Sequence, residues 1–414
     1  MIHSDTLCVN QKRYVHQSRK QMLGSEIDLL AWLETQTDTP KLYWKSRDSE
    51  SEMAAIGSVL LLNEVPLFDA GNDASVRFWG GHSFFPSADP KDKSWHTFPR
   101  TAFFLPKHEL IKTSEGIEVI THSINKPLTE AIEVLPTPVS PPCSLSQKGL
   151  HLPEEKHWEE MIHYSLGQIL DGPLKKVVLA RRSTLQSSKA IDPFSLLGNL
   201  PKSQATLFAL QFDPRQTFVG ATPERLYKRE GATVWTEAVA GTRPRGETPE
   251  TDRLLEAELR ASYKEKKEFS FVKTSLEHAL KPLCDIFNFG ADKVLKTPNV
   301  QHLWAKAQGK LKDGVRDEEL LETLHPTAAM GGHPKQEALS HLFEKEPFER
   351  GWYASPIGYI GTEGAEFVVG IRSALIEEKE LHLFAGAGII TGSNPADEWK
   401  ELEDKTALWR STFQ

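Results

Sequence analysis

The segment FVVGIRSALIEEKELHLFAGAGII, residues 367–390, decides the fold class. It contains three runs of strand length with short polar connections between them: Phe367–Ile371, Ala374–Glu377 and Leu381–Ala385. Short, mainly apolar runs with connections of this length are typical of antiparallel strands. The segment therefore predicts neighbouring strands of an antiparallel sheet.

Helices are expected on either side of such strands. A last helix is predicted from Ser393 through Trp409, because Asn394 is a favourable N-cap and Pro395 suits the first helical position. Upstream, hydrophobic periodicity predicts three more strands and two more helices: strands Lys176–Arg181, Ala205–Phe212 and Thr233–Ala238, and helices Pro153–Asp171 and Thr251–Leu280. Antiparallel strands joined by isolated helices indicate an α+β fold rather than a doubly wound parallel sheet.

The region before residue 135 is rich in predicted strands. They are expected at Lys41–Trp44, Gly57–Leu62 and Thr101–Leu105. The stretch LPTPVSPP at residues 135–142 cannot continue a helix or a central strand, since proline lacks the backbone donor. We therefore expect an N-terminal part of the fold at 1–135, a proline-rich connector at 136–153 and a larger C-terminal region at 154–414.

Composition excludes several classes of protein. The 414 residues include 49 Lys+Arg and 57 Asp+Glu, a formal charge of −8, without a basic run that would bind nucleic acid. The longest apolar stretches have strand length, far below the ~18 residues that cross a membrane. The 3 cysteines are unclustered and the start lacks a secretory signal. We expect a cytoplasmic protein without a disulfide framework or a thiolate metal site.

Three glutamates are candidates for a metal site. Glu398 and Glu401 lie three residues apart on the last predicted helix, with Lys405 four residues beyond, so they share one face. The alternative is a solvated face with an ordinary ion pair. Glu268 interrupts the apolar stripe of the long central helix, where a cation or one of the neighbouring lysines would have to pair with it: Lys264, Lys266 or Lys267. Together the three carboxylates would suit Mg²⁺, which prefers oxygen ligands.

Two further residues are candidates for proton transfer. Lys176 opens an apolar strand. If it is buried there, its pKa would be lowered and it could act as a general base; the alternative is an ordinary strand-end lysine that reaches solvent. Glu224, in the turn GATPE at 220–224, is either a helix-start acid or a catalytic acid.

Arg372, at a strand end, has the planar guanidinium that can bind a carboxylate through two hydrogen bonds, although arginine also forms ordinary surface pairs. Gly386 allows close backbone approach to an anion.

Six ordered motifs in the second part of the chain carry a family resemblance: KVVLAR at 176–181, GATPE at 220–224, AGTRPRG at 240–246, LHPTAA at 324–329, FAGAGI at 384–389 and EWKELEDK at 398–405. Their order and sequence resemble the chorismate-utilising enzymes, and among them the isochorismate synthases of the menaquinone-pathway type. The similarity spans roughly Glu154 to the C-terminus and is thinner before the connector.

The resemblance implies a fold of two packed antiparallel β-sheets with helices outside, and an active site in a cleft between them. By matching motif, Lys176 would activate water and Glu224 would protonate the departing hydroxyl. Glu268 and Glu401 would bind Mg²⁺, with Glu398 beside it. The substrate would be held or lined by residues from the remaining motifs and from a nearby strand: Gly241, Thr242, His302, Ala329, Arg372, Gly386 and Lys405.

The chemistry of this family accounts for those residue types. Moving a hydroxyl from C4 to C2 of chorismate requires a base on one side of the ring, an acid on the other and a cation on the ring carboxylate. Lys176 disfavours amine-adding relatives, which usually carry Gln there, whereas AGTRPRG looks as much like the anthranilate branch. Ala329 disfavours salicylate synthases, which tend to carry Thr. The alternatives are salicylate synthase, an anthranilate or aminodeoxychorismate synthase component, and a regulatory anion binder.

We expect the small molecule chorismate as the partner of this chain, and a monomer or weak homodimer.

Overall fold

The three strands predicted from the deciding segment are present in the computed structural model, but they lie in two different parts of the sheet. The structure describes residues 2–23, 27–48, 51–129, 132, 134, 149–201, 205–297 and 300–411. Strand β20 (Ser373–Glu377) pairs with β21 (Glu380–Ile389), whereas β19 (Gly364–Val369) pairs with β18 (Pro356–Gly361). The chain therefore crosses from one part of the sheet to the other between β19 and β20.

The remaining elements are runs of strands separated by one or more helices. The other strands are β1 (Ile2–Val9), β2 (Lys12–Leu23), β3 (Lys41–Lys45), β4 (Glu52–Leu62), β5 (Arg77–His82), β6 (Thr101–Thr113), β7 (Gly116–Ile124), β8 (Leu150–Leu152), β9 (Lys176–Gln186), β10 (Thr206–Asp213), β11 (Gln216–Thr222), β12 (Arg225–Glu230), β13 (Thr233–Pro244), β14 (Cys284–Phe289), β15 (Lys293–Lys296), β16 (Val300–Leu311) and β17 (Gly332–His333). The helices are α1 (Leu29–Thr35), α2 (Glu155–Asp171), α3 (Pro193–Gly198), α4 (Pro249–Ala261), α5 (Tyr263–Leu280), η1 (Lys281–Leu283), α6 (Asp317–Leu324), α7 (Lys335–Lys345) and α8 (Pro395–Ser411).

Antiparallel pairing runs from β6 into two branches. One branch continues through β4, β3, β10, β11, β20, β21 and β9. The other continues through β5, β18, β19, β12, β13 and β16. The two branches are the two packed antiparallel sheets that the sequence predicts, joined at one strand.

An aromatic core fills the space between the branches. It takes Phe104 from the shared strand β6, Trp79 from β5, and Phe218 and Phe384 from the opposite branch, all at most 2% exposed. Burying a side chain of this size contributes about 1.5–3 kcal/mol each. The mainly apolar runs of the predicted strands are thus accounted for by their burial.

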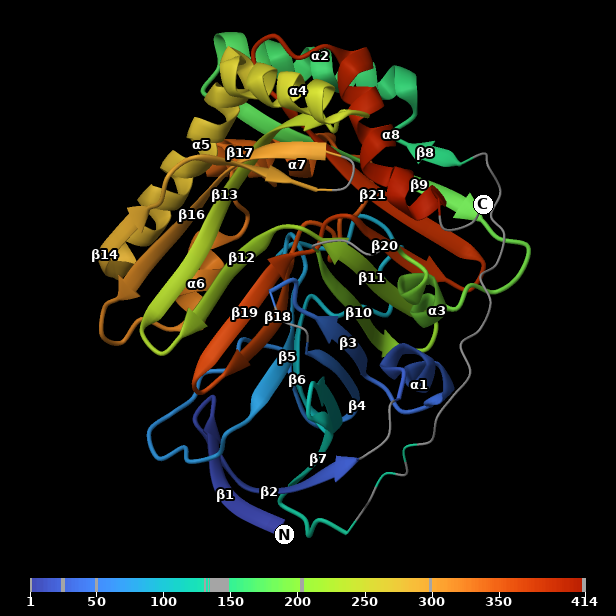
Figure 1. The fold of residues 1–414 in the computed structure, drawn as a ribbon, viewed down its shortest axis with the longest axis vertical. Helices are drawn as coiled ribbons and strands as arrows, with labels where there is room; N and C mark the ends of the chain where they lie inside the picture. Colours follow the sequence, from blue (N-terminus) through green and yellow to red (C-terminus); the bar gives the residue numbers. More distant parts are fainter. Residues whose placement is uncertain are drawn as a thin grey trace.

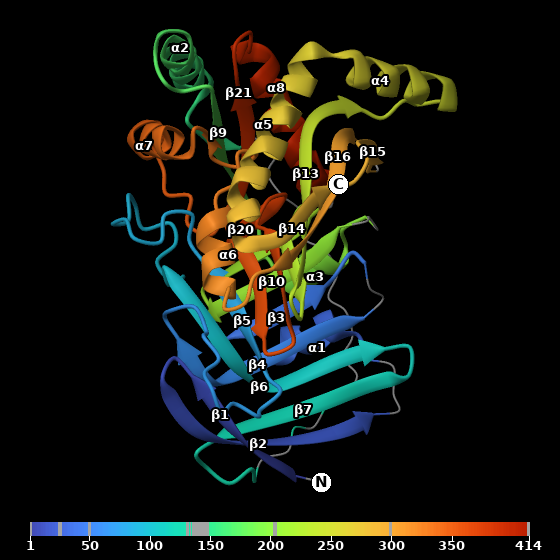
Figure 2. The same cartoon turned by 90° about the vertical axis from the view of Figure 1, so that its left-hand side faces the viewer.

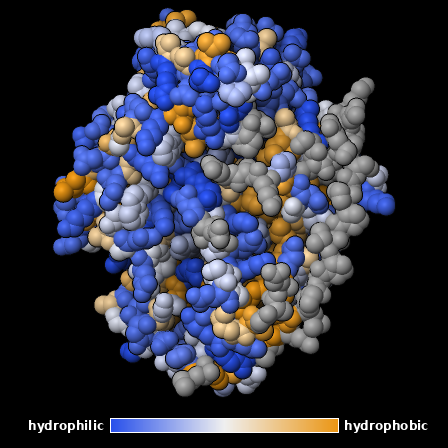
Figure 3. All heavy atoms as spheres, in the orientation of Figure 1, coloured by the Kyte–Doolittle hydropathy of each residue, from blue (hydrophilic) through white to orange (hydrophobic). Residues whose placement is uncertain are grey.

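Most of the helices cover the outside of the sheets, as Figure 1 shows for α2, α4, α7 and α8 at the top of the molecule. Figure 2 shows β1, β2, β4, β6 and β7 stacked at the opposite end, near the N-terminus. Hydrophilic side chains predominate over the face seen in Figure 3. Among the described residues, no helix has the length and apolar character needed to span a membrane.

One helix prediction is wrong in its boundaries. The single helix expected over 251–280 is two helices, α4 and α5, which meet at Ser262. This residue has extended dihedral angles, and its side chain accepts a hydrogen bond from the backbone N–H of Glu265. A serine that caps a new helix competes with continuation of the old one. Ala261, which a single helix would place on the same face as Glu268, therefore belongs to the preceding helix.

The connector expected at 136–153 lies outside the described residues up to position 148. The end of that range is ordered, because β8 at Leu150–Leu152 pairs with β9. The N-terminal strands expected near Lys41, Gly57 and Thr101 are confirmed as β3, β4 and β6. They are part of the same continuous pairing as the C-terminal strands.

Candidate active site

Helix α8 presents two of the predicted metal ligands. It begins where expected, because Asn394 Oδ1 accepts hydrogen bonds from the N–H groups of Ala396 and Asp397 at 3.0 and 3.3 Å. Lys405 Nζ lies 2.6 Å from Glu401 Oε1, one turn away. Lys405 also donates to the carbonyl oxygen of Gly386 at 2.8 Å. The helix is therefore tied to strand β21 through a residue predicted to bind substrate.

Glu398 and Glu401 repel each other inside the protein. Burial and the nearby Glu401 charge raise the pKa of Glu398, which is 2% exposed. Lys264 of helix α5 partly compensates, with its Nζ at 3.1 Å from Glu398 Oε1. Burial acts on Glu401 as well, but Lys405 outweighs it and the pKa of Glu401 is lowered. A cation between the two carboxylates would relieve this repulsion.

Lys176 and Glu268 form a buried ion pair. Lys176 is 1% exposed, and its Nζ donates to Glu268 Oε1 at 2.8 Å, across from β9 to α5. Of the two sequence interpretations, the strand-end lysine in solvent is wrong. Lys264, expected to pair with Glu268, contacts Glu398 instead. The backbone of Gly388 adjoins this pair, since a Cβ there would lie 2.7 Å from Glu268 Oε1.

Glu224 occupies a different environment. It lies between β11 and β12 and is 8% exposed. Burial, reinforced by the negative charge of Glu237, raises the pKa of Glu224 to about 8. The nearby cations Lys176 and Lys405 act in the opposite direction without cancelling the effect. Its carboxyl is therefore protonated at neutral pH, as the sequence interpretation of a catalytic acid requires.

The crossing between β19 and β20 places Arg372 between the two branches. Its φ of 49° lies in the left-handed region that side-chain-bearing residues seldom adopt. Its Nη1 donates to the carbonyl oxygen of Lys405 at 3.2 Å. Burial lowers the pKa of Arg372, partly offset by Glu401. A guanidinium in this setting remains charged and gains from an anionic ligand.

Strands β13 and β16 contribute the opposite wall. Gly241 has a φ of 72°, and a Cβ there would lie 3.0 Å from Glu265, so glycine is needed for both reasons. His302 Nδ1 lies 3.1 Å from both the Gly241 carbonyl oxygen and Thr242 Oγ1. Because a carbonyl only accepts, Nδ1 carries the proton. Burial, followed by Arg372, lowers the pKa of His302 to about 4, so the ring is neutral.

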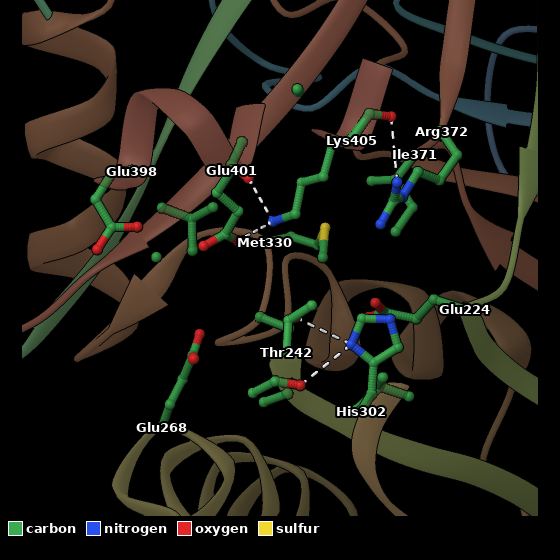
Figure 4. Close-up of a pocket in the computed structure, with 18 of the residues that line it drawn as sticks. Glu224, Thr242, Glu268, His302, Met330, Ile371, Arg372, Glu398, Glu401 and Lys405 are labelled. Atoms are coloured by element: carbon green, nitrogen blue, oxygen red, sulfur yellow. Dashed lines mark hydrogen bonds and ion pairs between the residues drawn. The ribbon is translucent and has the colours of Figure 1, made fainter. Parts of the chain in front are cut away.

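These residues meet in one cavity of about 370 Å³, a size suited to a small ligand. In Figure 4, Glu268, Glu398 and Glu401 lie on one side and Glu224, His302 and Arg372 on the other. All of the predicted site residues line this cavity except Lys176, which lies behind Glu268. The twelve positions named from the sequence are thus brought together from both branches and from two helices.

The acidic side of the cavity has the donor chemistry of a magnesium site. Each of its three carboxylates is paired with a lysine: Lys176–Glu268, Lys264–Glu398 and Lys405–Glu401. Within the described residues, no group of three or more acidic, histidine or cysteine side chains is close enough to form a preassembled cluster. Carboxylate oxygens are the ligands that Mg²⁺ prefers, and Glu398 and Glu401 already repel each other. The residues present fit a hard divalent cation.

Several lining residues were missed in the sequence. Tyr353, which is 3% exposed, and Met330 come from loops without a motif that would identify them. Arg243 and Glu265 form an ion pair at 2.7 Å at the cavity wall. Glu265 had a usable signal, because it lies three residues before Glu268 on the same helix. The pairing of Lys264 with Glu398 had no such signal, since the two residues lie on different helices.

Comparison with known proteins gives consistent matches. A family model described as chorismate binding enzyme matches residues 63–411. The chain is 31% identical to isochorismate synthase MenF of Haemophilus influenzae, over 97% of this chain and 94% of that protein. It also resembles the solved structure of MenF, the menaquinone-specific isochorismate synthase of Escherichia coli, with a TM-score of 0.82, 26% identity and coverage of 99% and 96%. Anthranilate synthase component I of Streptococcus pneumoniae shares the fold, with a TM-score of 0.66, 18% identity and coverage of 100% and 92%.

Proposed function

The chain belongs to the chorismate-binding enzymes, and on that premise we propose that it is a Mg²⁺-dependent isochorismate synthase. In this isomerisation a water molecule adds at C2 of the chorismate ring and the C4 hydroxyl leaves as water. The observation that carries the proposal is the Glu224 carboxyl, whose pKa of about 8 keeps it protonated beside two cations, Arg372 and Lys405. Such a cavity can bind a dianion and give it a proton.

Glu224 is proposed as the general acid. A hydroxyl is a poor leaving group until it is protonated, and an acid that still holds its proton at neutral pH can supply one. General acid catalysis of this kind contributes about 10²–10⁴-fold. The neutral His302, fixed by Gly241 and Thr242 at the same wall, can add a hydrogen bond without adding charge.

Lys176 is proposed as the general base. Its Nζ lies 2.8 Å from Glu268 Oε1 in an ion pair, and this pair has to be released before the amine can take a proton from water. Glu268, Glu401 and Glu398 are the residues that would hold Mg²⁺. When bound, the ion would supply positive charge to the ring carboxylate of the substrate.

The substrate carboxylates are proposed to bind at the cationic part of the cavity. Arg372 offers a planar fork, and Lys405 offers an ammonium held between Glu401 and the Gly386 carbonyl oxygen. Gly241 and Gly386 leave backbone groups open to close approach. Ala329 lines the cavity as the small residue that we expect to disfavour pyruvate release.

We assign the product to the menaquinone branch. This is supported by a relative and a solved structure that are both named MenF and that match nearly the whole of this chain. The chain is also similar to proteins named for salicylate biosynthesis and for 2,3-dihydroxybenzoate, each over a smaller share of its length. The lower coverage and TM-score of those matches favour the first assignment.

The test is incubation of the purified protein with chorismate and Mg²⁺, followed by chromatography of the products. Isochorismate alone is expected, and its formation should stop when the metal is chelated. Salicylate with pyruvate would instead indicate a lyase, and anthranilate formed in added ammonia would indicate the amine-adding branch. Tight binding of chorismate without turnover would indicate a regulatory binder. Any of these three results contradicts the proposal.

A further inference from the structure

A second glutamate lies directly behind the proposed acid, outside the cavity. Glu237 of strand β13 is 5% exposed. Its Oε1 accepts a hydrogen bond from the backbone N–H of Arg225, the residue after Glu224, at 2.9 Å. Its Oε2 accepts from Trp304 Nε1 at 2.9 Å. A buried carboxylate with this many donors is fixed in position, and it borders the turn that carries Glu224.

Arg47 completes this arrangement from a distant part of the chain. It follows β3, and its Nη2 lies 2.6 Å from Glu237 Oε2. Its Nη1 donates to the carbonyl oxygen of Pro223, the residue before Glu224. One guanidinium therefore contacts both Glu237 and the turn, which only a forked side chain can do.

The turn that carries Glu224 is fixed by hydrogen bonds on both sides of this residue. Glu224 N–H donates to Thr222 Oγ1 at 3.3 Å, and its carbonyl oxygen accepts from Val369 N–H at 3.0 Å. The neighbouring peptide groups are those that Arg47 and Glu237 hold. The backbone is thus immobilised, while the Glu224 side chain reaches the cavity wall.

We propose that Glu237, clamped by Arg47, is a positioning residue that aims Glu224 into the cavity and keeps its carboxyl protonated for proton donation. The inference rests on the proposed function, since it assigns a task in that reaction. Neither residue lines the cavity, so neither is expected to touch substrate.

After burial, the negative charge of Glu237 is the main cause of the raised pKa of Glu224. The groups that face Glu224 come from several elements: Lys176 of β9, Glu237 of β13, His302 of β16, Lys405 of α8, Arg372 and Tyr353 from loops, and Arg47 after β3. Lys176, Lys405 and Arg47 lower the pKa of Glu224, and His302 is neutral. Glu237 is the anion that raises it.

The test compares the pH dependence of kcat/KM for wild type and Glu237→Gln. This quantity reports groups in the free enzyme, the state described here, and its alkaline limb reports loss of the proton from the acid. Removing the negative charge lowers the pKa of Glu224, so the limb should move to lower pH by about one unit. Above both limbs the variant should then be about tenfold slower than wild type.

Two further variants separate charge from structure. Glu366→Gln is the matched control, because Glu366 is also buried and accepts from Arg225, at 2.7 Å, but is not among the main causes of the raised pKa of Glu224. The alkaline limb of the Glu366→Gln variant should coincide with that of wild type, even if this variant unfolds at a lower temperature. Glu237→Asp keeps the charge, so its limb should also stay close to that of wild type.

If wild type makes isochorismate but the alkaline limb of the Glu237→Gln variant does not move, the inference is overturned. Equal shifts in the Glu237→Gln and Glu366→Gln variants also overturn it, as does a Glu237→Asp limb that follows Glu237→Gln. A wild-type protein that makes no isochorismate contradicts the proposed function instead, so the two failures are distinguishable.

Discussion

The two ends of the cavity use the same residue type for opposite purposes. At one end Glu268, Glu398 and Glu401 each face a lysine, within 3.1 Å. At the other end Glu224 is buried against a second carboxylate, Glu237, and its pKa rises to about 8. The difference teaches that partners as well as burial decide whether a glutamate serves as an anion or as an acid.

The division suits a substrate that is itself a dianion. The paired end can exchange its lysines for a metal ion and substrate, because every charge there already has a counter-charge to replace. The unpaired end keeps a proton ready, since no cation lies within ion-pair distance of the Glu224 carboxyl among the described residues. The following experiments are designed to abolish this difference between the two ends or to measure it.

The largest effect is expected from Lys176→Ala at the paired end. Removing the proposed base should lower kcat by about 10²–10⁴-fold, because water is then no longer activated. Binding of chorismate, measured by calorimetry, should persist, since Arg372 and Lys405 are untouched. Lys175→Ala is the matched control, as Lys175 is adjacent, and its Nζ contacts only the Gly172 carbonyl oxygen among described residues. Full turnover in Lys176→Ala would remove this residue from the reaction.

A smaller effect is expected from Glu268→Gln. Loss of a proposed carboxylate ligand should weaken the apparent affinity for Mg²⁺ by at least about tenfold. Loss of a residue that only hydrogen-bonds to a metal ligand already costs about that much. The measurement is a titration of the chelator-treated enzyme with Mg²⁺, followed both by activity and by calorimetry of metal binding. Glu277→Gln, at the exposed end of the same helix, should titrate as wild type does. Identical curves for all three proteins would exclude Glu268 from the metal site.

Local sequence signals were sufficient for one of the three pairs at the paired end. The spacing of Glu398, Glu401 and Lys405 on a helix with a recognisable N-cap predicts their common face, and the structure gives the Glu401–Lys405 pair at 2.6 Å. The family motifs contain six further site residues: Lys176, Glu224, Gly241, Thr242, Ala329 and Gly386. That is information that a linear pattern contains.

The unpaired end depends on contacts that no local pattern contains. Arg47 and Glu237 are 190 positions apart, and their meeting depends on strand order in both branches of the sheet. Tyr353 likewise reaches the cavity from a loop between α7 and β18, a position that depends on long-range packing. The break at Ser262 was missed for a different reason, since helical periodicity continues across it and only the local capping geometry reveals two helices.

The smallest effect is expected in stability, from Glu224→Gln. The folded protein raises the pKa of this carboxyl from its ordinary value of 4.5 to about 8, so between those pH values the native state binds a proton that the unfolded state has lost. Stability of the wild type therefore falls as pH rises through this window. Glutamine is neutral at every pH and mimics the protonated acid, so it removes this cost.

Glu224→Gln should thus gain stability over wild type on the order of 4 kcal/mol at pH 8, since each unit of pKa shift is worth about 1.4 kcal/mol, and about nothing at pH 4.5. Denaturant unfolding at several pH values measures the difference, and the same preparation should lose turnover, because an amide cannot donate the proton that the leaving hydroxyl needs. A stability gain that accompanies loss of activity is the expected mark of a group held in an unfavourable environment for function. A difference that stays constant with pH would mean that Glu224 ionises normally, and the contrast between the two ends of the cavity would then be lost.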